Sequence, residues 1–164
     1  MNLPVGEVIS RGLNLREMDL RRLLEGFYDK GFSGYIVATI DGYDGVEEGV
    51  LIFKDGGMVA ALYDYDQHGL TVMGDGAMPH VFNSFAAEYV VADIVSLTNQ
   101  QVDLVTAFND KSKLLKVVGK SDVGRMIPRI YSAELAKSTL KELVKKDESK
   151  SELFKKLGLT GLGE

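Results

Sequence analysis

Apolar residues recur at helical spacing early in the chain. Five of them fall at positions i, i+3, i+4, i+7 and i+8, which is one face of a helix: Leu20, Leu23, Leu24, Phe27 and Tyr28. Asn14 and Glu17 have the spacing of a capping box, so the helix is expected to begin after Asn14. Gly31 is placed to end the helix in a left-handed conformation.

Three segments rich in β-branched and aromatic residues follow, at 33–40, 46–54 and 58–65. The Asp-Gly-Gly sequence at 55–57 predicts a tight hairpin, because glycine accepts the positive φ that primed turns require. Short connections between the three segments indicate a three-stranded antiparallel meander. Residues 1–13 are expected to be an arm or a short strand.

The region after the meander predicts a second helix and another strand. Asp75 is expected to cap the helix, with Pro79 in its first turn. The apolar run at 90–97 is interpreted as a strand, although so short a run is also compatible with a helix. Thr98 and Gln101 repeat the capping-box spacing before a further helix.

The C-terminal third is predicted to be mainly helical. Residues 111–118 suit a helix or a strand, and 119–128 are expected to form a loop because of their glycine and proline. A helix capped by Ser132 is expected to break at the charged run 145–150. A short helix capped by Ser149 would then end at Gly158.

This order of elements predicts the α+β class. We expect an antiparallel β-meander sheet with helices covering one face, followed by a C-terminal helical segment. We also expect a division between an α+β domain at 1–118 and a basic helical segment at 119–164 that packs on the domain or extends from it.

Charge divides unevenly along the chain. Residues 1–98 carry 6 Lys and Arg against 15 Asp and Glu, whereas residues 99–164 carry 13 against 9. The chain has no cysteine, which excludes disulfides and thiolate chemistry and suits a reducing cytoplasm. No apolar run approaches the roughly 20 residues that cross a bilayer, and the N-terminus lacks the pattern of a signal peptide. We therefore expect a cytoplasmic protein.

Part of the chain resembles known families. The sequence has a Gly-Phe-Ser-Gly step at 31–34, a strand–Asp-Gly–strand hairpin ending in Ala-Ala at 49–61, and Gly-Asp-x-Ala at 74–77 opening a helix. This pattern resembles the PATAN-type domain. Together with the segment 83–110, it is still more similar to an archaeal family of uncharacterised proteins related to that domain. The resemblance spans roughly residues 14–118.

The resemblance implies partner binding rather than catalysis, because PATAN-like domains are adaptor modules. It brings no catalytic residues and no cofactor. We therefore expect a non-enzymatic interaction or regulatory module with a protein partner or a second copy as its binding partner. The chain differs from the bacterial pattern in its basic helical tail and its lack of a receiver domain.

The alternative is a small-ligand or nucleotide-binding domain, which could be an enzyme, using the loop at 64–80. Asp64, Asp66, His68 and Asp75 have a spacing near that of a calcium-binding EF-hand loop. A histidine in place of an oxygen ligand, a short final carboxylate and an entering strand argue against calcium. The sequence therefore favours a polar loop without a metal.

The second histidine, His80, is expected one helical turn from Ser84 and near Asp75. A catalytic triad needs a nucleophile held against a base and the base held by an acid. Neighbours on one helix do not provide that geometry by themselves, so no catalytic residue is assigned. The acidic residues at 41–48 are interpreted as a solvated hairpin tip, because an acid–base pair needs a desolvated partner.

Two sets of residues are candidates for a partner surface. Tyr63 and Tyr65 alternate with aspartates and share one sheet face, where they belong either to the core or to an aromatic contact surface. Lys120, Arg125 and Arg129 could attract an anionic surface or could simply lie on solvated faces. Nucleic acid is not favoured, because the basic residues lack interleaved aromatics for base stacking.

Overall fold

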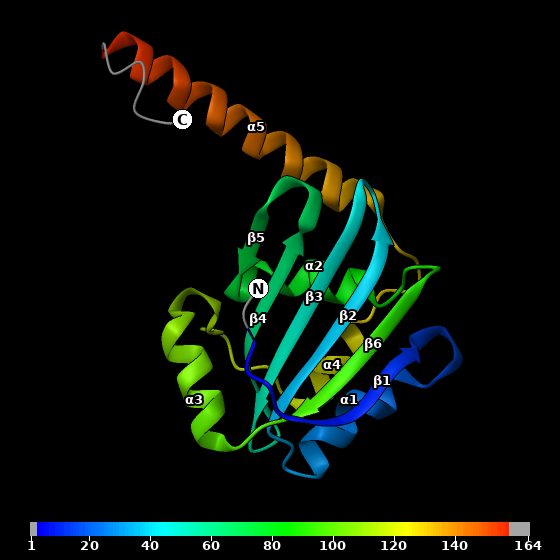
Figure 1. The fold of residues 1–164 in the computed structure, drawn as a ribbon. Coiled ribbons are helices and arrows are strands. Elements are labelled where there is room, and N and C mark those ends of the chain that lie inside the picture. Colours follow the sequence, from blue (N-terminus) through cyan, green and yellow to red (C-terminus); the bar gives the residue numbers. More distant parts are fainter. Residues whose placement is uncertain (1–2, 158–164) are drawn as a thin grey trace. The chain divides into compact units, whose positions relative to one another are not determined.

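A six-stranded antiparallel sheet forms the centre of the protein in a computed structural model that describes residues 3–157 (Figure 1). The strand order is β1-β6-β2-β3-β4-β5. The strands are β1 (Glu7–Asn14), β2 (Gly34–Gly42), β3 (Gly45–Lys54), β4 (Gly57–Tyr65), β5 (Leu70–Met73) and β6 (Val90–Ser96). Strands β2 to β4 are consecutive neighbours, which confirms the predicted meander.

Three further strands flank the meander. β5 pairs with β4, with Tyr63 opposite Val72, in a segment that the sequence analysis treated as a polar loop. On the other side β6 pairs with β2, with Val37 opposite Asp93, so the run at 90–97 is a strand as predicted. β1 adds outside β6 as the edge strand.

Five α-helices lie within the described residues: α1 (Leu20–Asp29), α2 (Met78–Ser84), α3 (Asn99–Phe108), α4 (Lys120–Met126) and α5 (Ala133–Lys156). Together with the antiparallel sheet they give the predicted α+β fold. Four 3-10 turns connect the elements, at Leu15–Glu17, Asp66–His68, Gly74–Gly76 and Asp110–Ser112. Over the described residues, no helix combines the length and apolar composition that crossing a membrane requires.

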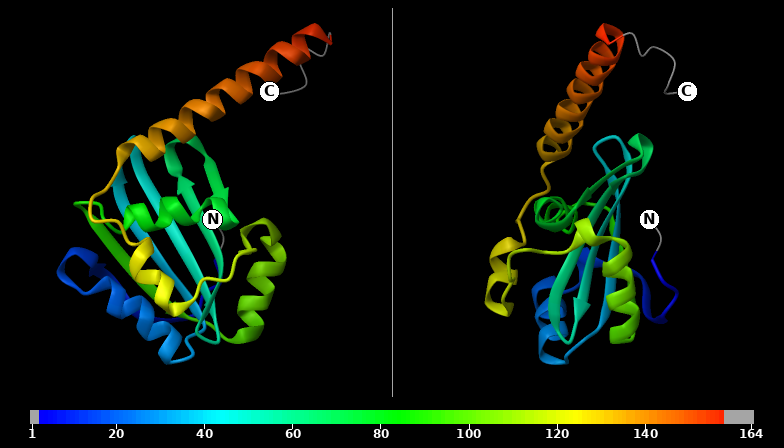
Figure 2. Two further views of the ribbon diagram at one scale, coloured as in Figure 1. Left: turned by 180° about the vertical axis from the view of Figure 1, so that it is seen from behind. Right: turned by 90° about the vertical axis from the view of Figure 1, so that its left-hand side faces the viewer.

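Helices cover both faces of the sheet (Figure 2). On one face, called here the back face, lie α1, α2 and α4, and α2 packs across β2, β3 and β4. On the front face α3 packs its Val102 and Val105 against Val50, Ile52 and neighbouring apolar residues. The expectation that helices cover one face is therefore corrected. Strand β3 is apolar on both sides, so both sides need cover.

Helix α1 begins later than its sequence predicts. Asn14 and Glu17 do interact, with a 3.0 Å hydrogen bond from the Asn14 amide to the Glu17 carboxylate, but Asn14 caps a 3-10 turn. The helix starts at Leu20 and is capped by Asp19, whose carboxylate accepts a 3.0 Å hydrogen bond from the N–H of Arg22. The predicted apolar face is nevertheless the face that is buried.

Helix α2 also differs from expectation at its start. Met78 begins the helix and no side chain caps it. Asp75 lies in the preceding 3-10 turn, where its carboxylate accepts hydrogen bonds from the N–H groups of Leu115 at 3.2 Å and Lys116 at 3.4 Å. The prediction that Asp75 caps α2 is therefore wrong, because this carboxylate holds a distant loop.

Residues 111–128 depart from prediction in two ways. The segment 111–118 is neither helix nor regular strand, since it contains the end of a 3-10 turn and one isolated bridge between Lys113 and Ala60. The expected loop at 119–128 contains α4, whose first turn is closed by a 3.2 Å hydrogen bond from the N–H of Gly119 to Asp122. This local cap outweighs the helix-weakening glycine within α4.

The chain divides at residue 131 into two compact units. The first contains the sheet and α1 to α4. Helix α4, which the sequence analysis assigned to the C-terminal segment, belongs to this first unit and packs on α1. The Lys120 ammonium lies 2.5 Å from the Asp29 carboxylate, and the Tyr28 hydroxyl donates a 2.9 Å hydrogen bond to the Val118 carbonyl.

The second unit consists of α5, described here by itself. The helix is continuous from Ala133 to Lys156. The predicted break at 145–150 is wrong, because lysine, glutamate and serine in that run are compatible with a helix interior. Ser149 accordingly lies inside α5, and the predicted end at Gly158 falls outside the described residues.

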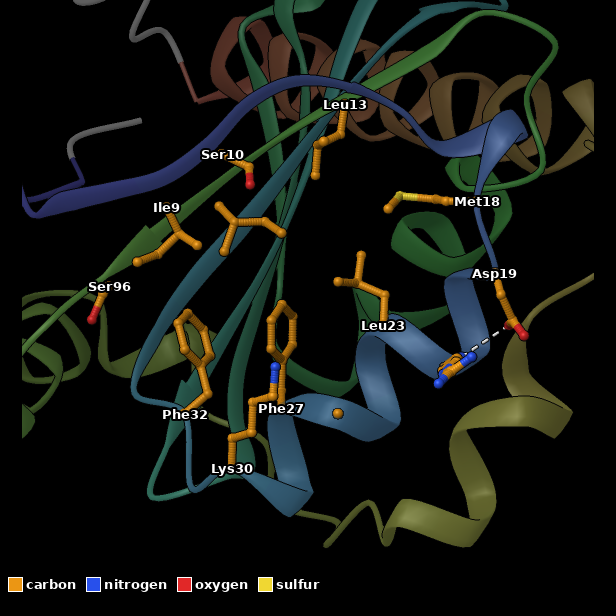
Figure 3. Close-up of a pocket in the computed structure, with 13 residues that line it drawn as sticks. Ile9, Ser10, Leu13, Met18, Asp19, Leu23, Phe27, Lys30, Phe32 and Ser96 are labelled. Carbon is orange, nitrogen blue, oxygen red and sulfur yellow. Dashed lines mark hydrogen bonds between the residues drawn. The ribbon is translucent and has the colours of Figure 1, made fainter.

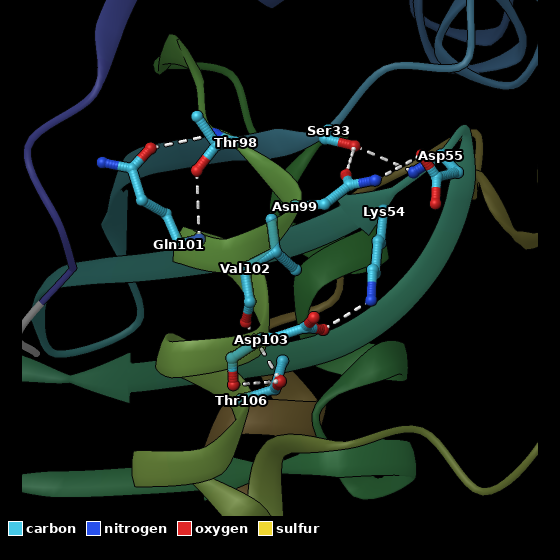
Figure 4. A network of polar contacts seen from close by, with 9 residues as sticks. All are labelled: Ser33, Lys54, Asp55, Thr98, Asn99, Gln101, Val102, Asp103 and Thr106. Carbon is cyan, nitrogen blue, oxygen red and sulfur yellow. Dashed lines mark hydrogen bonds and ion pairs between the residues drawn. The ribbon is translucent and has the colours of Figure 1, made fainter.

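The tip of the β3–β4 hairpin is tied to neighbouring segments by polar contacts (Figure 4). Asp55 and Gly56 have φ values of 49° and 84°, which confirms the predicted primed turn. The Asn99 amide donates a 2.7 Å hydrogen bond to the Asp55 carboxylate. Ser33 accepts a 2.9 Å hydrogen bond from the N–H of Asp55 and donates one of 2.5 Å to Asn99.

Helix α3 starts at this network, as its sequence predicts. Thr98 and Gln101 form a complete capping box, with backbone-to-side-chain hydrogen bonds of 3.2 and 2.9 Å. The Lys54 ammonium lies 2.6 Å from the Asp103 carboxylate one turn into the helix. The hairpin tip therefore fixes where α3 begins on the front face.

The same tip packs closely on the end of α1, and this contact can be tested. The N–H of Gly56 donates a 2.9 Å hydrogen bond to the Phe32 carbonyl, and a Cβ at Gly56 would lie 2.7 Å from the Tyr28 carbonyl oxygen. We expect Gly56→Ala to lower the free energy of unfolding by about 1–3 kcal/mol in urea denaturation, through backbone strain and this clash.

Gly57→Ala is the matched control for this substitution. A Cβ at Gly57 would have the Lys54 carbonyl oxygen as its nearest neighbour at 3.6 Å, which is an ordinary contact. Equal losses in the two alanine variants would contradict the close approach at Gly56.

Candidate functional site

A groove of about 770 Å³ lies between strand β1 and helix α1 (Figure 3). Its lining is mainly apolar, with principal contributions from Ile9, Leu13, Met18, Leu23, Phe27 and Ile94. In the close-up, Leu13 comes from β1 and Leu23 from α1, and both border the same space. Consecutive elements of the chain, joined by the 3-10 turn Leu15–Glu17, therefore form the two walls.

The helical cover of the back face ends at this groove. Ile94 on β6 is only 3% exposed, whereas Ile9 on the edge strand β1 is 54% exposed. Helix α1 thus covers β6 but not β1. An apolar strip of sheet remains open to solvent beside the helix.

The polar groups of the groove lie mainly at its rim. Arg22 and Lys30 line the groove, are exposed, and have no ion-pair partner among residues 3–157. The neighbouring Arg21 is instead paired with Glu25 at 2.7 Å. The only carboxylate in the lining, Asp19, is engaged as the α1 cap. The groove is therefore apolar, and the two exposed cations at its rim outnumber its one carboxylate.

A separate cluster of titratable side chains is buried between the sheet and α2. The Tyr63 hydroxyl donates a 2.5 Å hydrogen bond to the Glu47 carboxyl group, which also accepts a 2.9 Å hydrogen bond from the N–H of Tyr43. The Tyr65 hydroxyl lies 2.7 Å from Nδ1 of His80. Glu47 is only 2% exposed. These polar atoms satisfy one another in the interior, as buried polar groups must.

Burial shifts the titration of this cluster. Burial, followed by the hydrogen bond and charge of Glu47, raises the pKa of Tyr63. Burial lowers the pKa of His80. His80 is therefore neutral near pH 7, and which partner donates in its hydrogen bond with Tyr65 depends on the imidazole tautomer.

The front face carries an exposed apolar surface on the outer side of α3. Phe108 is 82% exposed and Leu104 is 57% exposed, one turn apart on the helix. Together with Leu3 and Pro4 they line a shallow hollow of about 450 Å³. We call these four residues the α3 patch. It lies on the opposite side of the sheet from the groove.

A protein-family model matches residues 1–109 of the chain. The chain belongs to the family DUF2226, uncharacterised proteins conserved in archaea. This confirms the part of the predicted resemblance that concerned an archaeal family. No curated protein and no solved structure matches the chain.

The region matched by the DUF2226 model contains the whole sheet and helices α1 to α3. Both walls of the groove and all of the buried tyrosine–histidine cluster therefore fall inside it. Helices α4 and α5 lie beyond residue 109.

The structure places the candidate residues of the 64–80 loop apart from one another. Asp64 accepts a hydrogen bond from the Thr71 hydroxyl on the neighbouring strand β5. Asp66 is exposed in a 3-10 turn. Nε2 of His68 lies 2.9 Å from the Asp44 carboxylate across the hairpin ends.

The other two candidates in this loop point elsewhere, since Asp75 holds the backbone at 115–116 and His80 contacts Tyr65 in the core. Within residues 3–157, no group of three or more histidine or carboxylate side chains is arranged to hold a metal ion. The structure thus does not bring the five residues together into one site.

The basic candidates lie on or just after α4. Lys120 is paired with Asp29, and Arg125 lies 3.8 Å from Asp122 in the preceding turn. Arg129 is exposed beyond the end of the helix. A role for these cations in binding a partner stays a prediction.

Tyr63 and Tyr65 lie in the core, with 1% and 2% of their surface exposed. Of the two predicted alternatives, they are therefore core residues and do not form an exposed aromatic contact surface. The prediction that Glu47 lies in a solvated hairpin tip is wrong, because its side chain is buried. Side-chain alternation could have located it, since Glu47 shares its sheet face with Gly49 and the buried Leu51.

Removing the Tyr63 hydroxyl tests whether the buried pair stabilises the fold. We expect Tyr63→Phe to lower the free energy of unfolding by about 1–3 kcal/mol, because the Glu47 carboxyl group loses a hydrogen-bond donor while remaining buried. The measurement is urea denaturation at neutral pH. In a Glu47→Gln background the same substitution should cost less, and an equal cost in both backgrounds would contradict the coupling.

His80 predicts a loss of stability in mild acid. Because burial lowers its pKa, the unfolded chain, with a histidine pKa of about 6.5, binds a proton at a higher pH than the folded chain. Stability is therefore fully present above this value and falls as the pH drops through and below it. We expect the free energy of unfolding to decrease between about pH 7.5 and about pH 5.5, and to decrease less in His80→Gln.

The exposed His68 supplies the control for this pH dependence. In a His68→Gln background, the free energy of unfolding should still fall more steeply with decreasing pH when His80 is present than when it is replaced by Gln. If instead His80→Gln unfolded with the wild-type dependence on pH, the buried imidazole would not be its source.

Proposed function

We propose that this protein is a non-enzymatic protein-interaction module, of the adaptor kind, that binds a segment of a partner protein in the groove between β1 and α1. The observation that supports this proposal is the open apolar strip at Ile9 beside α1, rimmed by Arg22 and Lys30, two cations with no ion-pair partner among the described residues. Exposed apolar surface with a polar rim is typical of sites where proteins associate.

The chemistry of the first unit supports binding rather than catalysis. Its buried titratable groups, such as Glu47 and His80, satisfy one another in the interior. The groove itself offers a single carboxylate that is engaged in capping. A small-ligand site at 64–80 has less support, because its candidate side chains lie at separate places.

The adaptor part of the proposal draws on the resemblance to PATAN-like domains. A helix precedes the meander, and the hairpin with its primed turn ends in the buried pair Ala60 and Ala61. We propose that this unit is PATAN-like. The adaptor role is carried over by analogy, since folds of one type serve many functions.

Groove-dependent capture of a partner tests this function. Wild-type protein and Leu23→Asp, which places a carboxylate in the apolar lining, are compared by quantitative affinity capture and crosslinking from native extract. We expect at least one protein whose recovery falls about tenfold or more with the variant, as for a substitution at an interface hot spot.

Leu104→Asp, the same change on the α3 patch, is the control, and both variants are first checked for wild-type folding by circular dichroism. If every captured protein were lost with Leu104→Asp and retained with Leu23→Asp, the groove would not be the binding site.

A further inference from the structure

The free strip beside α1 is the edge strand β1, where a further helix could lie and extend past the edge of the sheet. Neighbouring strands lie about 4.8 Å apart and a helix with its side chains is about 10–12 Å across, so each helix covers about two strands. Helix α1 covers β6, and within the described part of the first unit β1 has neither an outer strand neighbour nor a helix over Ile9. The layer formed by α1 and α2 therefore has room for one more helix at its β1 end.

An extended peptide fits this edge poorly. Strand addition needs a regular row of free backbone groups. The pairing of β1 with β6 is irregular at two places, between Val8 and Ser10 and between Ser10 and Leu13. In addition, the N–H of Gly12 donates a 2.8 Å hydrogen bond to the Asp93 side chain. Irregular edges of this kind work against pairing with a further strand.

The positive side chains at the rim favour some partner helices over others. Arg22 and Lys30 flank the apolar lining and have no acidic partner in the described part of the chain. Helix α5 of a second copy is the obvious candidate within this sequence, but residues 133–156 contain 7 lysines against 5 acidic residues. A helix with acidic flanks complements the rim, whereas α5 of another copy brings mostly like charge.

We infer that the groove binds an amphipathic α-helix of another protein, which lies beside α1 with its apolar side on Ile9, Leu13 and Leu23 and its acidic flank toward Arg22 and Lys30. This inference rests on the proposed function and specifies the partner for the same site. The bound helix extends the back-face layer over β1, and its apolar contacts follow the i, i+3, i+4, i+7 spacing of a helix.

The probe is a displayed library of random peptides of about 16 residues, a length at which a helix can form on binding. The library is selected on the full-length protein and counter-selected on Leu23→Asp. We expect enriched sequences with helical spacing of apolar residues and a net negative charge. An enriched peptide, made synthetically, should gain helical circular dichroism when it binds.

The double substitution Arg22→Glu/Lys30→Glu tests the rim without disturbing the apolar lining. It should weaken binding of the enriched peptide about tenfold or more in fluorescence anisotropy, and high salt should reduce this difference. Lys111→Glu/Lys116→Glu, the same charge change at two exposed lysines outside the groove, is the control and should leave the affinity within about twofold of wild type, apart from weak long-range electrostatics.

Several outcomes would overturn the inference. They are the absence of any enrichment, enrichment of proline-rich or basic sequences, tighter binding of a peptide of residues 133–156, and equal weakening by the control pair. If one of these outcomes occurred while Leu23→Asp still reduced the capture of a partner, the inference of a helical partner would be wrong, but the proposed interaction function would be supported. If Leu23→Asp did not reduce the capture of any protein, both the proposed function and the helical partner would be contradicted.

Discussion

The contact between the β3–β4 hairpin tip and the end of α1 sets the position of that helix, and the groove depends on this position. The N–H of Gly56 reaches the Phe32 carbonyl, and the absence of a Cβ at Gly56 allows the close approach to Tyr28. Phe27 then packs edge-on against Phe53, with ring centroids 5.0 Å apart. Held at β3 in this way, α1 covers Ile94 on β6 and leaves Ile9 on the edge strand exposed.

The front face depends on the same hairpin tip through polar contacts. Asp55 and Ser33 hold Asn99 at the start of α3, so the turn positions one helix on each face of the sheet. One local feature, a pair of residues at positive φ, thus couples the two layers. The arrangement explains how short helices with few apolar residues are fixed on a broad sheet.

The elements that could be predicted from the sequence are those with a strong local signal. The primed turn at 55–57 and the capping box at Thr98 are specified by residues within four positions of each other, and both occur in the structure. Strand β5 was not predicted, because four residues give no measurable alternation. Helix α4 was missed because Gly124 and Pro128 suggested a loop, whereas Asp122 caps the first turn.

The groove could not be predicted, because no motif encodes it. Leu23 and Phe27 belong to the predicted apolar stripe of α1, and such a stripe does not show which of its residues line a groove. Whether such a residue is covered depends on the distance between α1 and β1, which is a tertiary quantity. The candidate residues at 64–80 show the opposite error, since closeness in sequence did not bring His68 and His80 to a common place.

The irregular pairing of β1 has a consequence for the groove wall that it forms. A strand joined to the sheet along one side, through a ladder interrupted twice, opens at a lower free energy than the meander strands paired on both sides. The two walls therefore differ in stiffness: α1 is anchored through aromatic packing, and β1 is compliant. Local opening at β1 would therefore change the aperture of the groove at a lower free energy than movement of α1 would.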